Sequence, residues 1–155
     1  MIDKKELVIM SMLRQNSRET LTRMSRKSQI PISTIYDKIK LHENGIIKRH
    51  TCILDFAKLG FNTRANICLK VNKETREEMR DYLLKHQNIN SVYKINNGFD
   101  FLIEAVFKHI KDLEDFLEML DEKFKLKGRQ VFYIIDDVKR EAFMSDPQII
   151  ELVGA

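Results

Sequence analysis

Hydrophobic residues recur at helical spacing in three short stretches at the start of the chain. The first stretch covers residues 4–15, and Asp3 stands in position to cap it. The second is about two turns long and begins at Thr20. The third begins at Ser33, a good capping residue, and ends at Asn44-Gly45, which supplies a residue that tolerates a positive φ. The pattern therefore predicts three short amphipathic helices.

The last two predicted helices are joined by a tight turn at Pro31, and the segment 46–54 follows the third. This order is typical of a helix-turn-helix with a β-ribbon wing, in which the second helix of the pair enters the DNA major groove. The side chains that would read bases are Ser33, Thr34, Tyr36, Asp37 and Lys40. The basic residues that would hold phosphates are Arg23, Arg26, Lys27, Lys38, Lys48 and Arg49. Tyr36 is equally compatible with a core position, and each basic residue with a solvated surface.

A hinge is expected at residues 55–61, where Gly60 suits a change of direction. Beyond it, alternating apolar residues predict strands at 64–71, 89–95, 99–107 and 130–135. Helical spacing predicts helices at 74–86 and 111–123. The turn Asn96-Asn97-Gly98 between two apolar runs is a strong hairpin signal.

The resulting order, βαββαβ, is the split βαβ or ferredoxin-like arrangement, with both helices on one face of an antiparallel sheet. The predicted fold class is therefore α+β. It has a winged helix-turn-helix domain over residues 1–54, a hinge over 55–61 and a ferredoxin-like domain over 62–155.

The other face of this sheet would be uncovered. The strands and their ends supply more apolar side chains than one small core needs, namely Tyr93, Ile95, Ile103, Phe107, Val131, Tyr133 and Ile135. We therefore expect a homodimer or a higher homo-oligomer formed through the C-terminal sheet. The tail, residues 146–153, is apolar enough to dock, including across a subunit boundary, but it carries no motif.

Charge is distributed unevenly along the 155 residues, whose net charge is +4. Residues 1–60 hold 12 basic and 6 acidic side chains, whereas residues 61–155 hold 15 basic and 17 acidic ones. A basic first part favours a polyanion such as double-stranded DNA as the partner. No apolar run is long enough to span a bilayer, and the start has no signal-peptide plan, so we expect a cytoplasmic protein with no membrane association. Cys52 and Cys68 are expected to be reduced thiols.

Catalytic and metal-binding motifs are not apparent in the sequence. The four histidines lack metal-ligand spacing, and there is no phosphate-binding glycine loop and no nucleophile elbow. Adjacent acidic pairs such as Glu77-Glu78 point apart in a regular element. We therefore expect no catalytic residues, no metal and no cofactor.

Several short motifs resemble the Lrp/AsnC, or feast/famine, family of transcriptional regulators. They are Asn16-x-Arg18, Ile32-Ser33, Ile35-x-x-Lys38-Ile39, Asn44-Gly45-Ile46-Ile47 and Leu59-Gly60. The chain departs from the family pattern at Met24-Ser25, where Leu-Ala is usual, and it is one residue short between Ile39 and Gly45. The shortening puts Lys40 in doubt as a DNA contact.

The resemblance implies a C-terminal regulation of amino-acid metabolism domain that pairs through its sheet. It also implies a small effector, such as an amino acid, bound between subunits near the Gly98-x-Asp100 motif. Asp100 would then face an ammonium group, and the amides of Asn97 and Gly98 a carboxylate. A plain tight turn explains the same residues without any ligand.

Two other functions fit the same scaffold. Certain sirohaem decarboxylases resemble this family in both domains, but the basic surface here lies in the first domain and no histidine occupies an obvious pocket strand. An architectural DNA-binding protein without an effector is the other alternative. The leading interpretation is a sequence-specific transcriptional regulator whose DNA affinity responds to a small effector.

Overall fold

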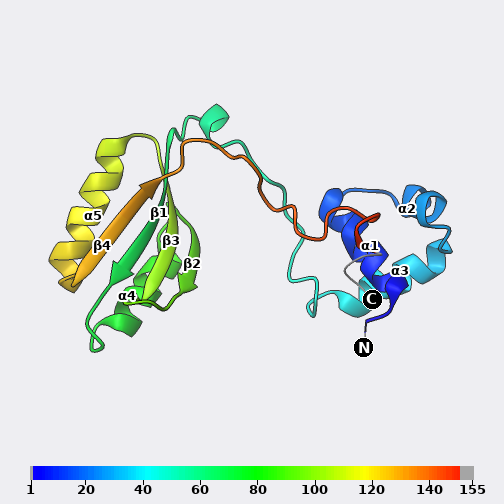
Figure 1. Cartoon of the computed structure of the whole chain (residues 1–155), viewed down its shortest axis with the longest axis horizontal. Helices are drawn as coiled ribbons and strands as arrows, with labels where there is room; N and C mark the ends of the chain where they lie inside the picture. Colours follow the sequence, from blue (N-terminus) through cyan, green and yellow to red (C-terminus); the bar gives the residue numbers. More distant parts are fainter. Residues whose placement is uncertain (1, 151–155) are drawn as a thin grey trace. The chain divides into compact units, whose positions relative to one another are not determined.

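The computed structural model describes residues 2–150 and divides them into two compact units (Figure 1). The helical unit contains residues 2–53 together with residues 138–150. The sheet unit contains residues 54–137. The chain therefore leaves the helical unit after residue 53 and returns to it after residue 137.

The helical unit contains three α-helices, α1 (Lys4–Gln15), α2 (Leu21–Ser28) and α3 (Ile32–His42). Their facing sides form a small core of buried apolar residues, namely Ile9, Met12, Met24, Ile30 and Ile35. The predicted cap of the first helix is confirmed, since Asp3 accepts from the Glu6 amide. Thr20, predicted as the first residue of the second helix, is its N-cap and accepts from the Arg23 amide.

The start of the third helix differs from the prediction. Pro31, not Ser33, is the N-cap residue, and the helix begins at Ile32. Proline suits the edge of a helix because its ring fixes φ and its missing amide proton would have no helical partner there. Ser33 therefore lies in the first turn of α3, where its side chain is exposed to solvent.

The predicted β-ribbon wing is absent from the described structure. Residues 48–54 form no strand, and the only pairing next to them is an isolated bridge between Glu43 and Ile47. A ribbon needs a second antiparallel segment to satisfy its amides and carbonyls, and this segment finds none within the described chain.

The sheet unit begins with a short 3-10 helix, Ala57–Leu59, which ends at Gly60 with a φ of 87° in the predicted hinge. The elements that follow are β1 (Thr63–Lys70), α4 (Arg76–Lys85), β2 (Ile89–Lys94), β3 (Phe101–Phe107), α5 (Ile110–Phe124) and β4 (Gly128–Tyr133). The strands are antiparallel and lie in the order β2-β3-β1-β4. This is the predicted split βαβ topology of a mixed α/β fold.

Both helices of this unit pack on one face of the sheet. Side chains of β1 alternate, with Ala65, Ile67 and Leu69 buried in the same core as Leu83 of α4 and Leu117 of α5 (Figure 1). One face of the sheet therefore carries nearly all of the buried apolar surface.

The opposite face carries different residues from those expected. Ile103 and Phe107 belong to the core beneath the helices, because the register places them with Ile67 and Thr63. The open face instead carries Cys68 and Asn66 of β1 and the residues that pair with them on the neighbouring strands. Its large apolar side chains are Tyr93, Leu102 and Phe132.

The segment after residue 137 also departs from the predicted domain division. The sequence assigned it to the second domain, but residues 138–150 lie against α1 in the helical unit (Figure 1). Leu152 and Val153, which belong to the apolar tail, lie outside the described residues. Within residues 2–150, no helix combines the length and the apolar character that a membrane span requires.

Candidate nucleic-acid interface and effector loop

A tight turn positions α3 against α2. Gln29 closes α2 in the left-handed conformation, with a φ of 57°, and Ile30 and Pro31 lead directly into α3. Ile35 on the inner side of α3 is completely buried in the helical core. The opposite side of α3 is consequently turned toward solvent.

The outer side of α3 carries most of the residues predicted to read bases. Ser33, Asp37 and Lys40 are exposed, and Thr34 is half-buried. Tyr36 is 51% exposed, so it lies outside the core, and the Lys40 ammonium sits 5.9 Å from the centre of its ring. The N-terminal half of α3 thus presents hydroxyl, phenol and carboxylate groups to solvent.

Lys38 has a different environment from the other predicted DNA contacts. Its Nζ lies 2.8 Å from Glu6 Oε1 and 3.4 Å from Asp3 Oδ2, both at the start of α1. The Glu6 carboxylate also meets Nε2 of His42 at 3.2 Å. Hydrogen bonds, first from Lys38 and then from the Asp3 amide, lower the pKa of Glu6 from 4.5 to about 2. Lys38 therefore ties α3 to α1.

Some of the remaining cations are paired with carboxylates. Glu19 lies 2.8 Å from Lys27 Nζ and 3.3 Å from Arg23 Nε, and Lys40 lies 3.0 Å from Glu43. Within the described residues, Arg26, Lys48 and Arg49 are exposed and have no carboxylate partner. These three charges are the most readily available to phosphates.

Sequence reasoning overlooked the acidic residues that hold these cations. Glu6 follows Asp3 by three positions, which is the spacing of a capping box, and this signal could have identified it. Glu19 gives no comparable signal, because it lies in a turn and meets Lys27 eight positions away only after α2 has formed.

The loop predicted to hold an effector connects β2 to β3. Asn97 and Gly98 both adopt a positive φ, 62° and 86°, as in a type I′ hairpin turn, so the Asn-Gly prediction is confirmed at the level of the turn. Both residues are exposed.

Asp100 is not a free counter-charge. Its Oδ1 lies 2.6 Å from Arg76 of α4, and its Oδ2 accepts a hydrogen bond from the Val71 amide at 2.9 Å. The carboxylate therefore joins α4, the end of β1 and the hairpin. Among residues 2–150, no three histidine, cysteine or acidic side chains gather in a way that could hold a metal ion.

Comparisons with known proteins give matches over most of the chain. Residues 64–142 match the model of the Lrp/AsnC ligand binding domain. The HTH-type transcriptional regulator FL11 of Pyrococcus furiosus is 29% identical over 135 residues, which cover 86% of this chain and 87% of that protein. An uncharacterized HTH-type transcriptional regulator of the same organism, PF0054, is 32% identical over 123 residues, or 77% of this chain and 79% of its own.

Solved structures show the same fold. LrpC of Bacillus subtilis superposes with a TM-score of 0.81 at 21% identity and covers 90% of this chain and 98% of its own. The regulator NMB0573 of Neisseria meningitidis was solved as a complex with L-Met. It gives a TM-score of 0.82 at 20% identity, and the match covers 90% of this chain and 94% of that one.

These matches define the class of the protein as a transcriptional regulator, not an enzyme. The chain belongs to the Lrp/AsnC family. The expected resemblance is confirmed, and the alternative of a decarboxylase on the same scaffold is set aside.

Proposed function

We propose that this regulator binds specific DNA sequences through α3, as the second helix of a helix-turn-helix. The observation that carries this proposal is the outer side of α3, where Ser33, Tyr36 and Asp37 are exposed at the N-terminal half of the helix. In this motif the N-terminal half of the second helix contacts base edges. The names of the relatives, which are HTH-type regulators, support the same function.

The phosphate contacts in this proposal come first from Arg26, Lys48 and Arg49, which are exposed and pair with no carboxylate of residues 2–150. Arg23, Lys27 and Lys40 can join them by exchanging a carboxylate for a phosphate, whereas Lys38 serves mainly to hold α3 in place. Each phosphate contact releases counterions, so binding should weaken steeply as salt is added.

A titration of fluorescent DNA tests this function. The probe is the promoter region of the gene itself, and the comparison is an unrelated duplex of equal length. We expect tighter binding to the promoter and a linear fall of log affinity with log salt. Equal affinity for both duplexes would favour the architectural alternative, and insensitivity to salt would contradict the electrostatic argument.

The variants Tyr36→Ala and Ser33→Ala, measured in the same titration, distinguish sequence-specific base contacts from non-specific electrostatic binding to DNA. Both variants should reduce the preference for the promoter more than they reduce binding to the unrelated duplex. Ser17→Ala is a matched control, because Ser17 precedes α2 and does not lie on α3.

We further propose that the protein is a homodimer formed through the open face of the sheet. Tyr93 and Phe132 on this face are more than half exposed, which is unusual for aromatic side chains unless they meet a partner. Phe132→Arg should shift the protein toward the monomer in analytical ultracentrifugation, whereas Leu84→Arg on α4, also exposed, should not.

An effector site near Asn97, Gly98 and Asp100 is the last part of the proposal. The support is the family, the exposed turn amides and the likeness in fold to a regulator solved with L-Met. Calorimetry with L-methionine and a panel of other amino acids is the test. Binding that is weakened by Asn97→Ala but not by Asn90→Ala, at the other end of β2, supports this site, and equal effects contradict it.

A further inference from the structure

The first helix is covered on two sides. Ile9 and Met12 face α2 and α3 in the helical core. Leu7 and Arg14 lie on another side, two turns apart, and both meet the segment 138–150. The residues between them on that side, Met10 and Ser11, are buried, whereas Arg14 itself is exposed at its edge.

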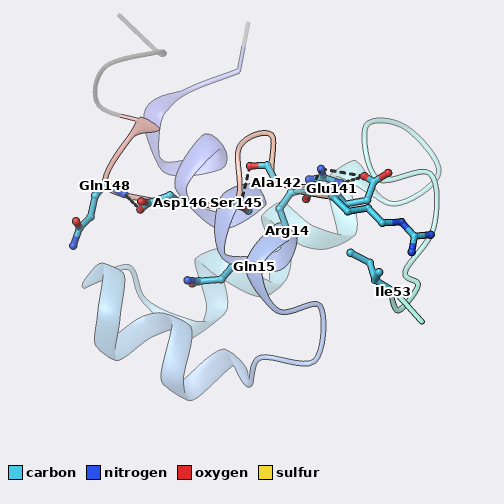
Figure 2. Close-up of a pocket in the computed structure, with 9 residues that line it drawn as sticks. Arg14, Gln15, Ile53, Glu141, Ala142, Ser145, Asp146 and Gln148 are labelled. Carbon is cyan, nitrogen blue, oxygen red and sulfur yellow. Dashed lines mark hydrogen bonds and ion pairs between the residues drawn. The ribbon is translucent and has the colours of Figure 1, made fainter. Parts of the chain in front are cut away.

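Arg14 is the polar anchor of this contact. Its guanidinium donates to the carbonyl of Phe143 at 3.1 Å. It also donates to the carbonyl of Glu141 at 3.0 Å and pairs with the Glu141 carboxylate at 3.2 Å (Figure 2). One side chain of α1 thus binds two backbone carbonyls and one carboxylate of the tail. Hydrogen bonds with an ionised donor are stronger than neutral ones.

The apolar anchor lies at the other end of the segment. Ile150 is only 3% exposed, although its neighbour Ile149 is 51% exposed. Ile149 and Ile150, together with Leu7 and Met144, line a cavity of about 630 Å³ between α1 and the tail. The tail is therefore held at both of its ends.

A further anchor, in the sheet unit, fixes the chain just before it enters the tail. Asp137 pairs with both terminal nitrogens of Arg64 on β1, and the Ile134 amide donates to the Arg64 carbonyl at 2.8 Å. Only residues 138–140 separate this anchor in the sheet unit from Glu141 in the helical unit. An extended chain of this length spans at most about 14 Å.

The other connection between the units, residues 54–62, is much longer. We propose that residues 138–150 form a C-terminal clasp, in which the outer side of α1 binds the tail and the short link 138–140 limits how far the helical unit can move from the sheet unit. The clasp, not the hinge, then sets the range of motion of the helical unit.

Limited trypsin digestion tests whether the tail is bound. Lys139 and Arg140 are cleavage sites at the start of the tail, and a protease that binds several residues on both sides of the bond cleaves there faster when residues 141–150 are released from α1. Arg14→Gln should raise the cleavage rate there by about tenfold, because it removes the charged donor of several hydrogen bonds. Arg18→Gln, an exposed arginine after the same helix, should leave the rate unchanged.

The pair Ile150→Ser and Ile149→Ser tests the apolar anchor in the same way. The two substitutions make the same chemical change at adjacent positions, and only Ile150 is buried. Faster cleavage for Ile150→Ser alone supports the clasp. Equal rates for both variants and the wild type would overturn the proposed docking.

Time-resolved fluorescence anisotropy tests the limit on motion. A dye is attached to a cysteine introduced at Thr22, an exposed position of α2, in a chain whose Cys52 and Cys68 are replaced by serine. Ten glycine and serine residues are then inserted between Val138 and Lys139, which lengthens the link but leaves the tail intact. The same chain without the insertion is the control.

We expect the insertion to shorten the rotational correlation time of the helical unit by about a factor of two, because a flexible linker lets the unit tumble on its own. An anisotropy decay unchanged by the insertion would overturn the limit on motion, even if the tail is shown to be docked.

Discussion

The Lys38 ammonium on α3 lies 2.8 Å from the Glu6 carboxylate on α1, and that carboxylate is only 6% exposed. The same carboxylate accepts from the Asp3 amide and meets His42 at the end of α3. One acidic side chain therefore completes the capping box of α1 and binds two residues in the C-terminal half of α3. The position of the helix that we propose to read DNA depends on this contact.

Glu6→Gln should destabilise the helical unit, because Lys38 and His42 lose a charged acceptor. The expected result is a lower melting temperature, measured by circular dichroism. Glu43→Gln, which breaks the more exposed pair with Lys40, is the matched control and should have little effect.

The dependence on pH follows from the pKa of Glu6, which is lowered from 4.5 to about 2. Its contribution to stability is complete above pH 4.5 and is lost as the pH falls through about 2. Urea unfolding between pH 6 and pH 3 should therefore show a steeper loss of stability for the wild type than for Glu6→Gln. Parallel curves would contradict the role assigned to this carboxylate.

Arg26 and Lys27 are adjacent cations of α2 with different partners. Lys27 is paired with Glu19, whereas Arg26 is exposed and has no carboxylate partner among the described residues. Arg26→Gln should weaken DNA binding and reduce the salt slope by about 0.9, the value for one phosphate contact. Lys27→Gln should change both less, because that charge is already partly neutralised. The reverse order in salt titrations would contradict this ranking of contacts.

Asp100→Asn should destabilise the sheet unit by about 2 kcal/mol, since the Arg76 guanidinium loses its charged partner. Denaturant unfolding is the measurement. Asp81→Asn removes an exposed carboxylate that lies 3.4 Å from Arg80 and should cost less than about 0.5 kcal/mol. If both variants are equally stable, the contact of Asp100 is not structural, and its carboxylate is available to a ligand.

Gly98→Ala should cost about 1 kcal/mol of stability, because a side chain at a φ of 86° is strained. An added Cβ would meet no atom within 4 Å, so crowding contributes nothing. Gly128→Ala is the control, since its Cβ would lie 3.9 Å from Lys70 and its φ is ordinary. A cost at Gly128 as large as at Gly98 would show that backbone strain is not the cause.

His86 should make the sheet unit sensitive to mild acid. Its ring lies 4.7 Å from that of Phe116, and burial lowers its pKa below 6.5. The neutral ring therefore stabilises the fold fully above pH 6.5, and this contribution is lost as the pH falls below that value. His86→Phe should flatten the stability curve between pH 7 and pH 5, whereas His50→Phe, at an exposed position, should not.

Local signals predicted the regular elements well. Asp3 caps the helix that follows it, as predicted, and Asn97-Gly98 forms the turn that its two positive φ angles require. These features depend on a few neighbouring residues, so the sequence contains all the information that specifies them.

Features that need distant partners were predicted less well. The segment 46–54 has the composition of a strand, but no neighbouring strand within the described chain pairs with it. Ile103 and Phe107 were counted in a set of apolar residues larger than one small core needs, although alternation along β3 relative to Ile67 puts both of them in the core. The inward face of a strand is decided by register with its neighbours, which a single run of residues does not reveal.

In the candidate sites, too, local features were predicted and contacts between distant residues were not. Sequence reasoning found the exposed polar residues of α3, but it took Lys38 for a free cation and Asp100 for a free anion. Each is paired with a residue more than 20 positions away. A side chain's availability to a ligand depends on such partners, and these become neighbours only when the chain folds.

The sequence by itself determined the order of helices and strands, the Asp3 cap of α1, the hairpin turn, the concentration of positive charge in the first 60 residues and the family resemblance. These follow from local conformational preference and composition. Only the tertiary structure decided which charges are paired, which face of the sheet is open and where residues 138–150 lie. Each of these outcomes depends on contacts between residues far apart in the chain, whose free energy appears only when both partners are in place.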